Sequence, residues 1–173
     1  MTWNVHSFKD EDGEQHDFSQ NAFKYIKKKN IDIAFLCETI KVEVPNFVNN
    51  YIELLDFGNS FISKTEEFTF DSEIWPDQTK AVMIEPRRML RLQYPDFDVL
   101  GVHLDHKNEL LRLEQIIFFL KKFSNQEKPQ ILCGDFNSMS QHDDTKDIQT
   151  TFYENGYGRI IFYVYSYIIN KGW

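Results

Sequence analysis

Hydrophobic and polar positions along the chain follow two different periods, which predicts helices and strands in alternation. Residues 109–123 carry apolar side chains every three or four positions, the spacing of a helix with one buried face. The expected buried stripe consists of Leu110, Leu113, Ile116, Ile117, Leu120 and Phe123. Another helix is expected to start at Asp17, because Asp17 and Gln20 have the spacing of a capping box.

Short apolar runs rich in β-branched and aromatic residues predict strands between turn residues. These runs are residues 3–8, 32–37, 59–63, 80–84, 99–104 and 130–133. After Asn137 the pattern weakens, and it predicts a polar loop over 138–147 and a short helix over 150–157. The alternation of the two kinds of element favours a layered α/β (α+β) structure.

The composition fits one globular domain and narrows the function. The chain has 173 residues, 42% hydrophobic and 27% charged, with a formal net charge of −8. This acidic balance disfavours a protein that coats nucleic acid through phosphate contacts alone. Residues 160–169 form the longest apolar run, shorter than the ~20 residues of a membrane span. We therefore expect no membrane span and, because Met1 is not followed by an apolar leader, an intracellular location, cytoplasmic or nuclear.

The two cysteines belong to apolar runs. Cys37 ends the run 33–37, and Cys133 ends the run 131–133. A pair of separate cysteines cannot build a disulfide framework, and free cysteine behaves as a small hydrophobe. Both are expected to be buried thiols in a reducing compartment.

Polar residues fall where the predicted strands end. Asn4 lies in the first strand, Glu38 and His103 lie at the ends of two others, and Asp135 and Asn137 follow a fourth. Strand ends are where layered α/β structures build their sites. Carboxylate, carboxamide and imidazole groups from four strands are typical of a metal-assisted hydrolase.

Each of these residues also has a plain structural interpretation. Asn4 can be an ordinary strand residue, and Glu38 a solvated carboxylate at a strand end. His103 can be a buried histidine with a satisfied hydrogen bond. Asp135 and Asn137 can form an Asx turn after a glycine. The sequence leaves these alternatives open.

Five segments in order resemble a known family. They are Thr-Trp-Asn-Val at 2–5, Phe-Leu-Cys-Glu-Thr at 35–39, Gly-Asn-Ser-Phe-Ile-Ser at 58–63, Val-His-Leu-Asp-His at 102–106 and Gly-Asp-Phe-Asn at 134–137. They are similar to the successive motifs of the endonuclease/exonuclease/phosphatase superfamily, which includes pancreatic-type deoxyribonucleases, apurinic endonucleases and neutral sphingomyelinases. The resemblance implies a DNase I-like four-layer sandwich, with two packed β-sheets flanked by helices.

The resemblance also implies hydrolysis of phosphate esters with a divalent metal, Mg²⁺ or alternatively Mn²⁺. Glu38 would bind the metal, with Asn4 close to it. Asn137 would hydrogen-bond the scissile phosphate, Asp135 would help to place the attacking water, and His103 would contact a phosphoryl oxygen or serve the leaving group. These residue types suit the task, because Mg²⁺ prefers oxygen ligands and an imidazole exchanges protons near neutral pH.

The resemblance breaks after Asn137. The family also carries an acidic residue in its C-terminal half and a terminal Ser-Asp-His motif, and neither is recognisable among the 36 residues (173 − 137) that follow. Leu104-Asp105-His106 is similar to that motif but comes too early. We therefore expect a truncated domain over residues 1–158, an atypical aromatic and aliphatic tail over 159–173, and impaired hydrolysis.

Other functions stay open at this point. The chain can be a catalytically inactive remnant that acts as a binding module, or an unrelated α/β binding domain with chance motif matches. A zinc site at His103 and His106 is disfavoured because no further ligand completes it. We expect Asp105 or His106 to cap the following helix. The substrate can be nucleic acid, phospholipid or a small phosphate ester, and protein partners are unknown.

Overall fold

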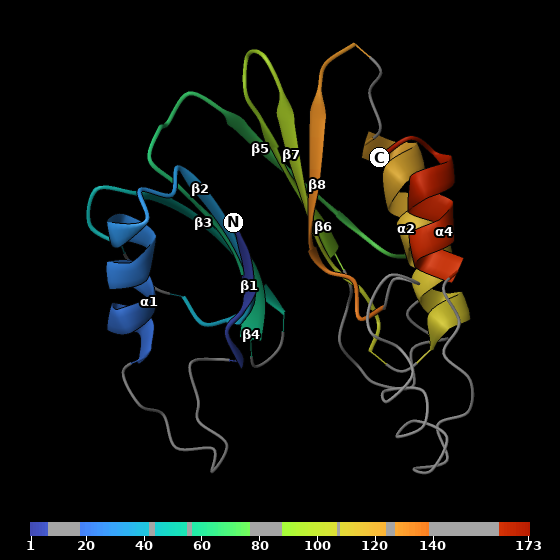
Figure 1. The fold of residues 1–173 in the computed structure, drawn as a ribbon, viewed down its shortest axis with the longest axis horizontal. Helices are drawn as coiled ribbons and strands as arrows, with labels where there is room; N and C mark the ends of the chain where they lie inside the picture. The colour runs from blue at the N-terminus through green and yellow to red at the C-terminus, as the bar shows by residue number, and fades with distance from the viewer. Residues whose placement is uncertain are drawn as a thin grey trace.

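A computed structural model describes eight segments of the chain. They are residues 1–6, 18–41, 44–54, 57–76, 88–106, 108–123, 127–138 and 163–173. The strands form two four-stranded sheets, which we call the first and the second sheet. Helices cover the outer face of each sheet, so the layers follow one another as helix, sheet, sheet and helices (Figure 1).

The first sheet has the strand order β1-β2-β4-β3. Its strands are β1 (Thr2–Asn4), β2 (Ile33–Thr39), β3 (Val48–Leu54) and β4 (Phe57–Ser63). β1 and β2 are parallel, and α1 (Phe18–Lys28) lies between them in the chain. α1 packs on the outer face because its Ala22 and Ile26 are buried together with Ala34 and Leu36 of β2.

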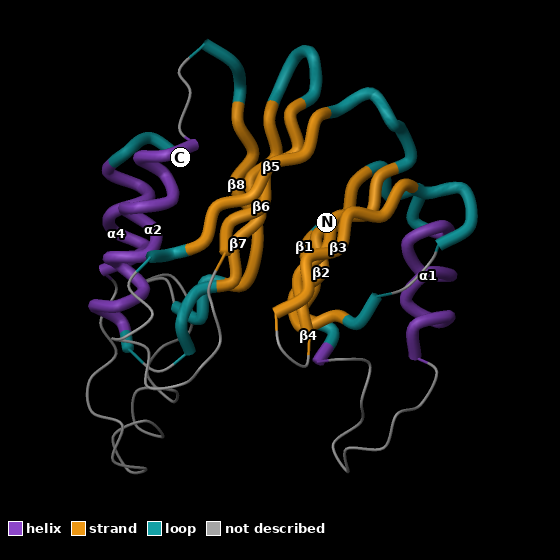
Figure 2. Tube along the Cα trace, turned by 180° about the vertical axis from the view of Figure 1, so that it is seen from behind, coloured by secondary structure: helices purple, strands orange, loops and turns teal. Residues whose placement is uncertain are grey.

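The second sheet has the order β5-β6-β7-β8. Its strands are β5 (Thr69–Ile74), β6 (Arg88–Gln93), β7 (Asp98–His103) and β8 (Gln130–Asp135). β7 and β8 are parallel, and α2 (Glu109–Phe123) lies between them in the chain. α4 (Tyr163–Asn170) lies beside α2 on the outer face (Figure 2), and its Val164 is buried in the core that α2 forms with the sheet.

A third core lies between the sheets, in addition to the two that the helices form with the outer faces. Phe35 and Phe61 of the first sheet pack there against Leu90, Leu92 and Val99 of the second. The alternation of side chains along each strand assigns one set to this core and the other to the helices. The architecture confirms the predicted DNase I-like arrangement of two sheets flanked by helices.

The predicted stripe of α2 is partly wrong. Leu110 is 57% exposed and Ile117 is 38% exposed, whereas Leu111 and Phe119 are buried. α2 packs against both the second sheet and α4, and this turns its buried face by about one position relative to a stripe drawn from spacing alone.

The cap of α2 also differs from the prediction. The cap is Asn108, whose Oδ1 accepts hydrogen bonds from the backbone N–H groups of Leu110 and Leu111 at 3.0 and 3.2 Å. Asp105 acts one step earlier, because its Oδ1 accepts from the N–H of Asn108 at 2.9 Å. The helix therefore begins after Asp105 and His106, the two residues that were expected to cap it.

Several predicted elements lie outside the described residues. These are the capping residue Asp17, the strand over 80–84, the helix over 150–157 and most of the polar loop over 138–147. Residue 158 lies there too, so a domain boundary at this point stays a prediction. None of the helices in the described segments is long and apolar enough to cross a membrane.

Candidate active site

Asn4 joins the two sheets at the end where β1 and β8 finish. Its Nδ2 donates a hydrogen bond to Oε1 of Glu38 at 3.0 Å and another to Oδ2 of Asp135 at 2.9 Å. Its Oδ1 accepts from the backbone N–H of His6 at 3.1 Å. One carboxamide therefore holds two carboxylates close together, one from each sheet.

Glu38 stands at an irregular point of β2. The pairing with β4 shifts register between Leu36 and Thr39, and Glu38 has a φ of +52°. A left-handed conformation in a residue other than glycine costs about 1 kcal/mol or more. Backbone strain of this kind persists where the surrounding structure holds it, and here it turns the Glu38 carboxylate toward Asn4 and His103.

His103 meets Glu38 from the second sheet. Its Nε2 lies 3.6 Å from Oε1 of Glu38, and its side chain is only 5% exposed. The imidazole is thus buried with a carboxylate beside it. A buried histidine with a partner is the structural interpretation that the sequence left open, and the contact agrees with it. The same contact places a side chain that can carry a proton beside the Glu38 carboxylate.

Asp135 and Asn137 are fixed by the end of β7. β8 pairs with β7 so that Asp135 lies opposite His103, and the backbone N–H of Leu104 donates to the carbonyl of Asp135 at 3.0 Å. Asn137 donates through Nδ2 to the carbonyl of Leu104 at 3.0 Å. Its backbone N–H donates to Oδ1 of Asp135 at 2.9 Å, so the Asx turn is present as part of the site.

Gly134 allows β8 to approach β7 closely. Its φ is +143°, and a Cβ atom at this position would lie 1.9 Å from the carbonyl oxygen of Val102. No other residue fits this backbone conformation and this spacing. The glycine of the Gly-Asp-Phe-Asn segment therefore places Asp135 beside His103.

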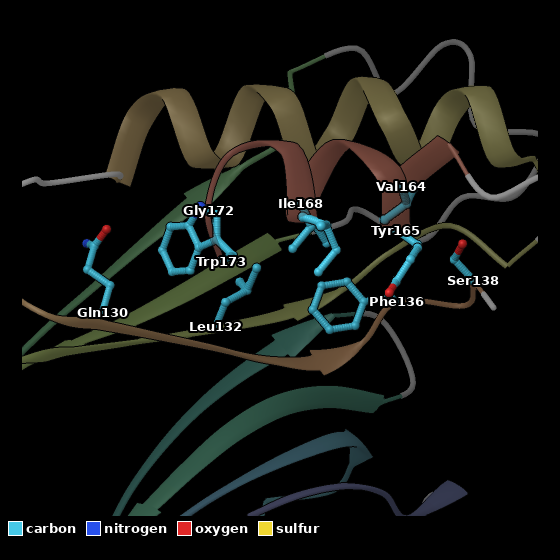
Figure 3. Close-up of a pocket in the computed structure, with 10 residues that line it drawn as sticks. Gln130, Leu132, Phe136, Ser138, Val164, Tyr165, Ile168, Gly172 and Trp173 are labelled. Atoms are coloured by element: carbon cyan, nitrogen blue, oxygen red, sulfur yellow. The ribbon is translucent and has the colours of Figure 1, made fainter. Parts of the chain in front are cut away.

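Two hollows flank β8. An open cleft of about 560 Å³ is lined by residues 2–4 and 134–138, which include Asn4, Asp135 and Asn137. A mostly apolar cavity of about 530 Å³ lies on the other face of β8, beneath α4 (Figure 3). Phe136 and Ser138 line both hollows. The cleft gives access to Asn4, Asp135 and Asn137, whereas Glu38 and His103 are not among its lining residues.

The side chains around Asn4 have the donor atoms that the expected metal requires. Within the described segments, no group of three or more His, Cys, Asp or Glu side chains has the arrangement of a metal cage. Mg²⁺ needs no such cage, since it takes one or two carboxylates and keeps several waters. Glu38 and Asp135 provide two carboxylates beside one carboxamide, which fits Mg²⁺ or Mn²⁺ and does not fit a tetrahedral zinc site.

The two thiols lie close to this centre and differ in burial. Cys37 is fully buried, and burial raises the pKa of its thiol well above the usual range. Cys133 is only half-buried, less than the sequence predicted, although burial of its sulfur still raises the pKa to about 11. Both remain protonated near neutral pH, so neither is an activated nucleophile.

Four of the predicted residues, Asn4, Glu38, Asp135 and Asn137, are linked by hydrogen bonds, and Nε2 of His103 lies 3.6 Å from Oε1 of Glu38. The model of the Endonuclease/Exonuclease/phosphatase family matches residues 1–171. The chain belongs to this family. No curated protein sequence matches it significantly.

Several solved structures share the fold of this chain. A Bacteroides vulgatus endonuclease/exonuclease/phosphatase superposes with a TM-score of 0.64 at 16% identity, over 87% of this chain and 69% of that one. A functionally unknown conserved protein from Enterococcus faecalis V583 gives 0.62 at 17%, over 86% and 70%. Humanized TDP2 from D. rerio gives 0.61 at 18%, over 80% and 62%. The chain spans 62% of the length of that TDP2 and 60% of another D. rerio TDP2 chain.

Proposed function

We propose that this chain hydrolyses phosphate esters with the help of Mg²⁺ or Mn²⁺ at the centre formed by Asn4, Glu38, His103, Asp135 and Asn137. The observation that carries the proposal is the double contact of Asn4 Nδ2 with Glu38 and Asp135. Family membership supports phosphoester hydrolysis as the reaction class. The contact brings one carboxylate from each sheet together beside the cleft that Asn4, Asp135 and Asn137 line.

Glu38 would hold the cation, and Asn4 would keep the carboxylate of Asp135 next to it. The bound cation neutralises charge on the phosphate oxygens and so makes the phosphorus easier to attack. Two carboxylates beside an anionic substrate repel it when no cation is present. The arrangement therefore predicts that substrate binding depends on the metal.

The remaining residues act on the substrate itself. Nδ2 of Asn137 has two N–H groups, and the carbonyl of Leu104 accepts from one of them. The other can donate to a phosphate oxygen without adding charge. Asp135 can accept a proton from the attacking water and orient it, and Nε2 of His103 can give a proton to the leaving oxygen.

The direct test is hydrolysis of bis(p-nitrophenyl) phosphate with Mg²⁺ or Mn²⁺. The chain is compared with Glu38→Ala and His103→Ala, and with Lys121→Ala, an exposed change on α2, as control. Loss of a group that transfers protons lowers the rate by about 10²–10⁴. We expect both site variants to lose activity and the control to keep it. Equal rates in all four proteins would favour the inactive binding module instead.

The turnover of this chain is expected to be low. No Ser-Asp-His sequence follows Asn137 among these 173 residues. The resemblance implies that the histidine of this motif is the base that acts on water, and this base has no recognisable counterpart here. Its absence costs about 10²–10⁴ in rate. The comparison with a Ser-Asp-His-containing family member under the same conditions measures this cost directly.

Nucleic acid is the substrate class with a specific observation in its favour. D. rerio TDP2, which has the same fold, is known in complex with a single-strand DNA product. The net charge of −8 opposes nonspecific binding of a polyanion, so selective contacts in the cleft would have to supply the affinity. Faster cleavage of a single-stranded oligonucleotide than of a phospholipid or a small diester supports this class, and the reverse order contradicts it.

A further inference from the structure

Glu109, the first residue of α2, connects three segments that are distant in the sequence. Its Oε1 accepts hydrogen bonds from Oγ of Ser138 at 3.1 Å and from the backbone N–H of Val164 at 3.0 Å. Its Oε2 accepts from Nε of Arg112 at 2.7 Å. The side chain is only 10% exposed. A carboxylate that is nearly buried and accepts three hydrogen bonds is held firmly in one position.

One of these contacts fixes the start of α4. Val164 is the second residue of α4, and the first N–H groups of a helix have no acceptor within that helix. Glu109 supplies the missing acceptor from a different helix, and its negative charge lies at the positive end of the α4 dipole. Val164 and Ser138 lie toward the same end of the cavity in Figure 3. Glu109 therefore fastens α4 at that end.

Another contact reaches the candidate site. Ser138 directly follows Asn137, which has a φ of +47° and depends on its surroundings to keep that conformation. On one side, Leu104 and Asp135 accept hydrogen bonds from Asn137. On the other side, Ser138 donates to Glu109. The short segment that carries Asn137 is thus held from both ends.

We propose that Glu109 is a positioning residue for Asn137 and acts through the Ser138 hydroxyl. The proposal rests on the proposed function, in which Asn137 contacts the phosphate. A shift of about 1 Å in a group that contacts the reacting phosphate can cost up to 10²-fold in rate. Because the same Oε1 also accepts from α4, the seating of α4 and the geometry of Asn137 depend on one atom.

The kinetic test separates positioning from general stability. Ser138→Ala removes only the link to the site and leaves the Val164 contact in place. We expect it to lower kcat about 3–10-fold with KM nearly unchanged, the sign of an interaction used in the transition state. Glu109→Ala should cost at least as much, and Glu109→Gln should recover most of the rate, since its oxygen can still accept from Ser138. Glu114→Ala, on the exposed side of α2, is the matched control.

The double variant Glu109→Ala/Ser138→Ala gives a second kinetic check. If the two residues act through one hydrogen bond, the combined loss in kcat is smaller than the product of the single losses. An unchanged kcat in Ser138→Ala, together with a lower melting temperature in Glu109→Ala, would mean that Glu109 only stabilises α4. That outcome overturns the proposal.

Hydrogen exchange at the backbone N–H of Asn137 tests the positioning without any activity. We expect faster exchange in Glu109→Ala and Ser138→Ala than in the unchanged chain, and no change in Glu114→Ala. Faster exchange in a chain that hydrolyses no phosphate ester would contradict the proposed function and support the positioning. Unchanged exchange in both variants overturns the positioning, even in an active enzyme.

Discussion

Nδ2 of Asn4 donates to Oδ2 of Asp135 at 2.9 Å, although 131 positions separate the two residues in the chain. The contact ties the first strand of the first sheet to the last strand of the second. The same nitrogen also donates to Glu38. A neutral donor between two carboxylates holds them together at a distance at which they would otherwise repel each other.

A charge change at Asn4 should therefore make stability depend on a divalent cation. Asn4→Asp places a third carboxylate between Glu38 and Asp135 and removes their common donor. We expect the free energy of unfolding in EDTA to fall by about 1 kcal/mol or more, and excess Mg²⁺ to restore most of it. Urea unfolding with and without Mg²⁺ measures both effects. Asn4→Ala is the control, because it removes the donor without adding charge and should respond less to Mg²⁺.

Substitutions at Glu38 should change stability and activity in different ways. Both Glu38→Gly and Glu38→Ala remove the carboxylate, and they differ only in the Cβ atom. At a φ of +52° glycine is unstrained, so Glu38→Gly should be more stable than Glu38→Ala by about 0.5–1 kcal/mol. Neither variant should hydrolyse bis(p-nitrophenyl) phosphate. Thermal unfolding that ranks the two in the opposite order would show that the left-handed conformation is absent.

Three glycines should respond differently to alanine. Gly134→Ala drives a Cβ atom against the backbone oxygen of Val102, which cannot move away, so we expect a loss of more than about 3 kcal/mol. Gly101→Ala meets the ring of Phe35 at 2.5 Å and should cost about 1–3 kcal/mol. Gly172→Ala faces open space and should cost least, about 1 kcal/mol, for its φ of +84° alone. Denaturant midpoints of the three variants test this order.

The buried thiols should lower stability at alkaline pH. In the unfolded chain a thiol ionises near its ordinary pKa of 9.0, whereas burial raises the folded pKa of Cys133 to about 11 and that of Cys37 further. Their contribution to stability is complete below about pH 9. It is lost as the pH rises toward the folded pKa values, because the unfolded state then releases protons that the folded state keeps. The free energy of unfolding, measured between pH 7 and 11, should fall less steeply above pH 9 in Cys37→Ala. An identical slope in both proteins would contradict the assigned burial.

Hydrophobic spacing predicted the helices and strands that bury one continuous apolar face or run. α2 has the predicted bounds, and β2, β4, β7 and β8 lie within a few residues of the predicted runs. β5 was missed because its side chains are mostly exposed or half-buried and its residues alternate weakly. α4 was missed because a run of Tyr, Val and Ile favours a strand as much as a helix, and only its packing on α2 decides between them.

The five candidate residues could be identified because each stands at or near a strand end, and strand ends of packed sheets meet. Their hydrogen bonds could not be predicted, since they depend on the register shift at Glu38 and on the close approach at Gly134. Glu109 gave no signal of this kind. It looked like an ordinary acidic residue at a helix start, and its partners Ser138 and Val164 lie 29 and 55 positions away.

Paramagnetic broadening by Mn²⁺ tests the central claim most directly, namely that Glu38 and its neighbours form a divalent-cation centre. The side-chain amide signals of Asn4 and Asn137 should broaden when Mn²⁺ is added in small amounts, whereas the amide of Asn30, in the turn after α1, should stay sharp. In Glu38→Gln the broadening at Asn4 should be lost or need far more Mn²⁺. Equal broadening of Asn4 in Glu38→Gln and in the unchanged chain, or none in either, would contradict the account.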